Sequence, residues 1–193
     1  MNLRVKRWIL VAVCVILFII PETKGQKIGV KTNLLTWATT SLNIGLEFGT
    51  GVHSTINLFG SYNPFEFSST KKLKHWVFMP EYRYWTCERF NGSFFGVHML
   101  GGKFNVGGIK LPWEIFSNLE KYRYQGWGIG GGLTYGYQWL LGKHWNLEAS
   151  IGAGYAYLKY DKFPCAECGE RLDKGVKHYF GVTKAAISLI YLF

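Results

Sequence analysis

A two-residue alternation of apolar and polar positions organises the chain, and it is clearest between Gly126 and Leu140. Apart from Gly131, every second residue in this stretch is large and apolar, and Trp127 and Trp139 lie at its two ends. The positions between them hold glycine, threonine or glutamine. Because successive side chains of a β-strand point to opposite faces, the pattern predicts a strand with one apolar face and one small, polar face. Aromatic residues at both ends are typical of a membrane-crossing strand, since Trp and Tyr settle at the lipid–water interfaces.

The same alternation recurs along the chain. We predict eight strands, over Lys27–Thr36, Leu42–Phe48, Val52–Tyr62, His75–Trp85, Ser93–Gly102, Gly126–Leu140, Trp145–Tyr160 and Tyr179–Phe193. An even strand number is usual in single-chain bacterial outer-membrane proteins, which have short periplasmic turns and longer outer loops. We therefore expect an all-β fold, an eight-stranded antiparallel up-and-down transmembrane β-barrel with both termini in the periplasm.

The N-terminus has a different pattern, which predicts a secretory signal peptide. Arg4, Lys6 and Arg7 precede an unbroken apolar run over Trp8–Ile20, which Pro21 ends. That run of 13 residues is shorter than the roughly 20 that a spanning helix needs, which disfavours the alternative of an uncleaved anchor. We expect residues 1–25 to be a cleavable signal peptide and residues 26–193 to form the outer-membrane barrel.

Composition and charge support this class. The chain has 24 glycines, 18% aromatic residues and a net charge of +10. Its mean hydropathy is +0.03. So much glycine argues against a helical membrane protein or an ordinary α/β enzyme. Residues 26–193 hold 18 basic and 11 acidic side chains, a net charge of +7. Basic loops would attract lipopolysaccharide or acidic glycans, although solvated loop ends would give the same composition.

Charged residues occur on the polar faces of the predicted strands, where they would line the lumen. The expected lumen charge network consists of Lys31, Glu47, Glu81, Arg83, Glu148 and Lys184, with His98 nearby. An eight-stranded barrel is just wide enough for side chains to fill it, and unpaired buried charges are costly. The pattern therefore favours a structural network of ion pairs over a proton relay or a catalytic carboxylate pair.

The remaining candidate motifs predict structure or assembly rather than chemistry. Cys165 and Cys168 form a C-x-x-C pair without further zinc ligands or a thioredoxin-like context, and we expect a disulfide in the last outer loop. Residues at steps of two in the last strand resemble the C-terminal signal that the barrel assembly machinery reads: Ile187, Leu189, Tyr191 and Phe193. We predict no catalytic, cofactor-binding or metal residues.

Two short motifs carry a family resemblance. Lys31–Thr40 reads KTNLLTWATT, and Asn43–Glu47 reads NIGLE. These motifs resemble an uncharacterised family of small outer-membrane β-barrel proteins from Bacteroidetes, a domain of unknown function that opens with K-T-N-L-L-x-W-A-T. The resemblance implies a Gram-negative outer-membrane barrel similar to the OmpA transmembrane domain, and it brings no established activity.

Three functions fit the sequence. The favoured one is a non-enzymatic outer-membrane protein, structural or a subunit of a larger complex, whose basic, aromatic loops contact surface glycolipid or partner proteins. Its expected partners are outer-membrane lipid and lipopolysaccharide, the barrel assembly machinery during biogenesis and other outer-membrane proteins, with no cofactor and no nucleic acid. A lipid A-modifying enzyme is an alternative, although His53, Ser54 and His144 show no acid–His–Ser spacing. A narrow pore is the other alternative.

Overall fold

The computed structural model describes residues 28–68, 71–108, 119, 122–164 and 171–193. The expected signal peptide and the Cys165–Cys168 pair lie outside these residues, so both stay predictions. The elements are β1 Ile28–Asn33, α2 Leu34–Trp37, β2 Leu42–Gly49, β3 Ser54–Asn63, β4 Glu66–Ser68, β5 Lys71–Trp85, β6 Gly92–Gly107, β7 Arg123–Leu140, β8 Trp145–Phe163 and β9 Asp173–Leu192.

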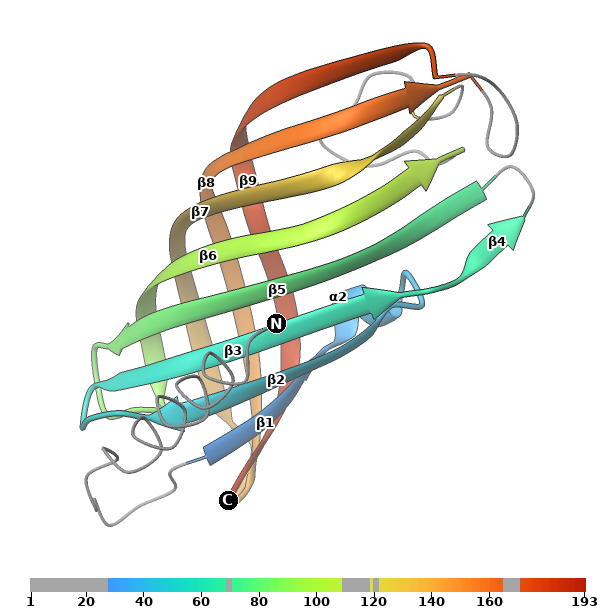
Figure 1. Ribbon diagram of the computed structural model, residues 1–193. Helices are drawn as coiled ribbons and strands as arrows, with labels where there is room; N and C mark the ends of the chain where they lie inside the picture. The colour runs from blue at the N-terminus through green and yellow to red at the C-terminus, as the bar shows by residue number, and fades with distance from the viewer. Residues whose placement is uncertain (1–27, 69–70, 109–118, 120–121, 165–170) are drawn as a thin grey trace, which may run out of the picture.

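Eight of the strands form one closed ring (Figure 1). Each main strand pairs antiparallel with the main strands before and after it, and β1 pairs with β9 to complete the circuit. The short β4 adds a pairing at the edge of β5. The predicted all-β fold of eight antiparallel strands is confirmed, and the ring is barrel-like.

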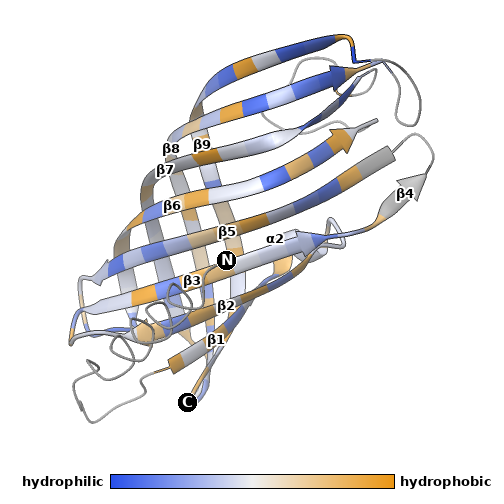
Figure 2. Cartoon of the chain, viewed as in Figure 1, coloured by the Kyte–Doolittle hydropathy of each residue, from blue (hydrophilic) through white to orange (hydrophobic). Residues whose placement is uncertain are grey.

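The apolar faces of the strands point out of the ring. On β7 the side chains of Ile129 and Leu133 are 55% and 68% exposed, whereas Thr134 and Gln138 are buried. Figure 2 shows hydrophobic and hydrophilic residues alternating along the strands. The Gly126–Leu140 alternation therefore separates an apolar outer surface from a polar interior, the reverse of a water-soluble sheet.

The interior is polar in the middle and apolar towards both ends. At the short-turn end a buried cluster consists of Trp85, Phe90, Phe94, Ile190 and Leu192. Towards the other end, Val106, Leu119 and Tyr124 form a second buried cluster. Buried charged residues lie on the strands between these two clusters.

Strand lengths differ greatly around the ring. β1 and β2 have 6 and 8 residues, whereas β8 and β9 have 19 and 20. The alternation predicts a last strand from Tyr179, but β9 starts at Asp173 because its pairing with β8 continues to Lys162. The ring is therefore taller on the β7–β9 side than on the β1–β2 side (Figure 1).

The first strand is shorter than the predicted Lys27–Thr36. It ends at Asn33, whose side-chain oxygen accepts a hydrogen bond of 3.1 Å from the Leu35 N–H and caps α2. Asn is a favoured N-cap residue, so this side chain starts a helical turn where the alternation suggested more strand. Among the residues that the structure describes, no helix is long and apolar enough to cross a membrane.

Candidate functional site

A β-bulge in β9 brings two consecutive polar residues into the interior. Gly152 of β8 pairs with Lys184, but the next residue, Ala153, pairs with Val182, so Thr183 has no partner across the ladder. A bulge of this kind re-aims side chains. In a regular strand, only one of two consecutive side chains would point inwards. Because of the bulge, both Thr183 and Lys184 reach groups in the interior.

Arg83 is the centre of the buried charges. Its guanidinium binds three carboxylates: Nε is 2.7 Å from Glu81, and Nη1 is 2.9 Å from Glu47 and 2.8 Å from Glu148. Nη2 donates a further bond of 3.1 Å to Glu148. The guanidinium also lies over the Phe94 ring, 4.3 Å from its centroid. This planar fork, with five N–H donors, suits several carboxylates at once.

Two lysines complete the neutralisation of the three glutamates. Lys31 Nζ lies 2.5 Å from Glu47 and 3.2 Å from Glu148. Lys184 Nζ lies 2.7 and 2.8 Å from the two oxygens of Glu81. The structure thus joins all six expected network residues, three acids and three bases, in one buried network with balanced charge. Such close pairing offsets the cost of removing the charges from water.

Neutral side chains supply further hydrogen bonds to the network, which the sequence pattern does not predict. Thr55 donates a 2.6 Å bond to Glu47 and in turn accepts one of 3.0 Å from the Trp85 indole. Asn57 donates to Glu81 at 3.3 Å. Thr55 and Asn57 occupy inward positions of β3. The alternation along this strand therefore indicates that both side chains face the interior, but not which groups they contact.

His98 lies within hydrogen-bond distance of two hydroxyl groups in the interior. Its Nδ1 is 2.8 Å from Thr134 Oγ1, and its Nε2 is 2.8 Å from Thr183 Oγ1. Both ring nitrogens are therefore occupied, and the side chain is buried. The arrangement ties β6, β7 and β9 together, which is a structural role.

A cavity of about 190 Å³ adjoins the network. Lys31, Arg83 and Lys184 line it, together with Asn57 and His75. One water molecule needs about 10–15 Å³ of such space, so the cavity has room for several. The described residues contain no group of three or more His, Cys, Asp or Glu side chains placed to hold a metal ion.

His53 and His144, the two turn histidines of the enzyme alternative, each lie close to a backbone carbonyl group. His53 Nδ1 lies 2.5 Å from the Cys87 oxygen, and His144 Nδ1 lies 3.0 Å from the Leu192 oxygen. Each contact ties a turn to a neighbouring segment.

The expected assembly signal lies along the outer face of β9. Ile187 and Phe193 are exposed, and the Tyr191 and Phe193 rings are 4.9 Å apart. The Phe193 N–H donates a 2.9 Å bond to the Ile28 carbonyl at the β1–β9 junction. Recognition by the assembly machinery stays a prediction.

A comparison with protein families covers nearly the whole chain. Residues 10–193 match the family described as "Protein of unknown function (DUF3575)". The chain belongs to this family. The predicted membership of a family with unknown function is confirmed, whereas the Bacteroidetes grouping and the likeness to OmpA stay predictions. Comparisons with curated proteins and with solved structures found no match.

Proposed function

We propose that this protein is a non-enzymatic integral outer-membrane protein of a Gram-negative bacterium. Its ring of strands is a transmembrane β-barrel that acts as a structural element or as a subunit of a larger outer-membrane complex. The observation that carries the proposal is the combination of an apolar outer surface with a buried, charge-balanced interior.

The outer surface fits lipid rather than water. Exposed apolar side chains occur on every main strand, among them Ile44, Phe78, Val97, Leu133, Ile151 and Phe180. Soluble monomers rarely expose a contiguous apolar patch larger than a few hundred Å². In a bilayer the same residues would contact acyl chains, and the closed ladder would satisfy the backbone of the strands.

The dimensions of β7 match a bilayer. Trp127 and Trp139 both point outwards and are twelve residues apart. At about 3.3 Å per residue, this separation is about 40 Å along the strand. A strand tilt of about 40° reduces it to about 30 Å across the membrane. That equals the usual hydrocarbon thickness of about 30 Å, so the two indoles would lie at opposite interfaces.

The interior supports a scaffold over a pore or an enzyme. Arg83 and its three glutamates lie in the interior between two apolar clusters, an arrangement that opposes ion flow. His53 and His144, the histidines considered for lipid chemistry, lie within hydrogen-bond distance of backbone carbonyls. Contacts with glycolipid or partner proteins are then the expected work of the molecule.

Expression of the full chain in a Gram-negative host tests the proposal. We expect the protein in the outer-membrane fraction, resistant to carbonate extraction, and migrating faster on gels before boiling than after it. Pull-down in mild detergent would then identify the partners. A mature protein that is soluble and migrates identically with and without boiling would refute the proposal.

A further inference from the structure

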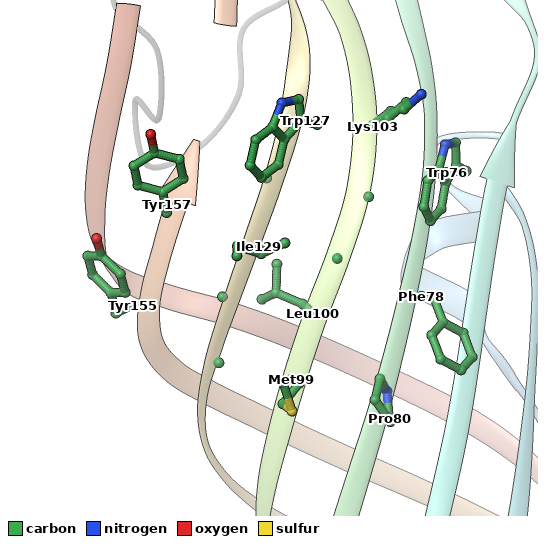
Figure 3. A pocket seen from close by; sticks show the side chains of 15 residues that line it. Trp76, Phe78, Pro80, Met99, Leu100, Lys103, Trp127, Ile129, Tyr155 and Tyr157 are labelled. Carbon is green, nitrogen blue, oxygen red and sulfur yellow. The ribbon is translucent and has the colours of Figure 1, made fainter. Parts of the chain in front are cut away.

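A hollow in the outer wall crosses β5, β6, β7 and β8 (Figure 3). Its volume is about 760 Å³, within the range of roughly 300–1,000 Å³ that is typical of small-molecule sites. Apolar and aromatic side chains line it, including Trp76, Phe78, Trp127, Ile129 and Tyr157. We call this hollow the outer groove.

The outer groove exists because two of its outward positions, Gly101 of β6 and Gly131 of β7, have no side chain. Gly101 of β6 lies between Phe78 of β5 and Ile129 of β7 in the strand register. A Cβ atom on Gly101 would meet one atom within 4 Å, Ile129 Cγ2 at 3.9 Å. The groove is therefore open above Gly101, which forms its floor, and apolar side chains bound it on both sides.

A cation stands at the end of the outer groove nearer the long connections. Lys103 lies two residues beyond Gly101 on the same face, and the register places it between Trp76 and Trp127. Figure 3 shows Lys103 between the two indoles. Its side chain is exposed, and no hydrogen bond or ion pair joins it to another residue of the described part of the chain.

We propose that the outer groove holds an acyl chain of a phosphorylated outer-leaflet glycolipid, with the phosphate of that lipid bound by Lys103. The inference rests on the proposed membrane location. The two Trp residues would mark the interface, the Phe78–Ile129 gap would take the alkyl chain below it, and the ammonium would meet the phosphate above it.

The charge favours a lipid over a transmembrane helix. A single lysine at the interface end complements one phosphate group. An apolar helix would leave that charge without a role.

Native mass spectrometry of the full chain in detergent tests the assignment. The probes are bis-phosphorylated lipid A, its dephosphorylated form and phosphatidylglycerol, with inorganic phosphate as a competitor. We expect one lipid A per protein, about fivefold weaker retention of its dephosphorylated form, and no displacement by inorganic phosphate. One interfacial lysine–phosphate contact is worth about this factor. Phosphatidylglycerol retained as tightly as lipid A would overturn the assignment to a glycolipid.

Two substitutions and two matched controls locate the site. Lys103→Gln should weaken lipid A retention about fivefold, and Gly101→Leu, which fills the floor, should weaken it by on the order of tenfold. Lys159→Gln removes a charge on the other side of Trp127, outside the groove lining. Gly60→Leu adds a side chain on β3 where a Cβ meets nothing within 4 Å, on the side of Phe78 opposite Gly101 and outside the groove lining. Both controls should retain lipid A as the native chain does.

Insertion into vesicles separates the two proposals. A chain that fails to insert would overturn both the membrane location and the lipid site. A chain that inserts but binds all three lipids equally would overturn the lipid site alone. Equal lipid A retention by all four variants would also overturn the lipid site. So would a protein that forms a dimer instead of binding lipid A, if Gly101→Leu disrupts that dimer.

Discussion

Arg83 shows how strongly one side chain can be tied to its surroundings. It is 1% exposed and contacts Glu47, Glu81 and Glu148. Removing it would leave three carboxylates with two lysines inside the ring. Breaking a buried pair by deleting one partner typically destabilises a protein by about 3–5 kcal/mol.

We therefore expect Arg83→Met to lower the free energy of unfolding by about 3–5 kcal/mol, measured by urea denaturation in detergent micelles. Arg171→Met is the matched control, because Arg171 pairs with Asp161 at 3.6 Å on the exposed surface. Exposed pairs contribute about 0–1 kcal/mol. Equal effects of the two substitutions would contradict the central role of Arg83.

The alternation along the sequence predicts which charged side chains point inwards, but not which acid pairs with which base. Lys31, Glu47 and Arg83 lie at inward positions of three different strands, and the parity of each strand is readable from its apolar neighbours. Pairing depends on the stagger of strands around the ring, which no local pattern encodes. The Thr55 and Asn57 contacts were missed for the same reason.

At the scale of elements, β9 departs most from its predicted form. Strict alternation over Tyr179–Phe193 would put Tyr179 on the face of Tyr191. The bulge at Thr183 reverses the parity, so that Phe180 is 78% exposed and Tyr179 is partly buried. A bulge adds one residue without a distinct sequence signal, and this reversal could not be predicted from the pattern.

Deletion of Thr183 should be far more damaging than its substitution. The deletion forces either Lys184 off Glu81 or Phe180 into the lumen, because a one-residue shift exchanges the two faces of a strand. Thr183→Val keeps the chain length and loses one hydrogen bond with His98, worth about 1 kcal/mol.

The measurement is the fraction of protein that shows heat-modifiable gel mobility after refolding in detergent. We expect little folded protein for the deletion and nearly native amounts for Thr183→Val. A deletion variant that folds as well as Thr183→Val would show that the bulge is dispensable.

At the scale of the whole molecule, the position of an outward residue should set the energetic effect of a charge. Leu133 lies near the middle of β7, and Gln125 lies beyond Trp127 on the same face. Leu133→Arg should destabilise the protein in bilayers by about 2–4 kcal/mol, and Gln125→Arg by about 0–1 kcal/mol. Unfolding titrations in lipid vesicles measure both, and near-neutral values for Leu133→Arg would argue against acyl-chain contact.

The closed interior predicts electrical silence. The native chain in planar bilayers should show no stepwise conductance, since the Arg83 network lies between apolar clusters at both ends. Channel openings from purified protein, absent from a mock preparation, would favour the narrow pore. The all-β class and the eight antiparallel strands were predictable at this scale, whereas the extended pairing of β7–β9 was not, because it follows from tertiary contacts.

In the proposed outer-membrane location, the unequal strand lengths would also decide from which side molecules outside the cell can reach the protein. The long ends of β8 and β9 would rise beyond the lipid headgroups, whereas β1 and β2, with 6 and 8 residues, would stay near their level. Antibodies, proteases and neighbouring cell-surface proteins would then meet a one-sided rim. The height difference would also orient any complex that contains this subunit. The long strands β8 and β9 would block access from their side, and the side of β1 and β2 would stay accessible.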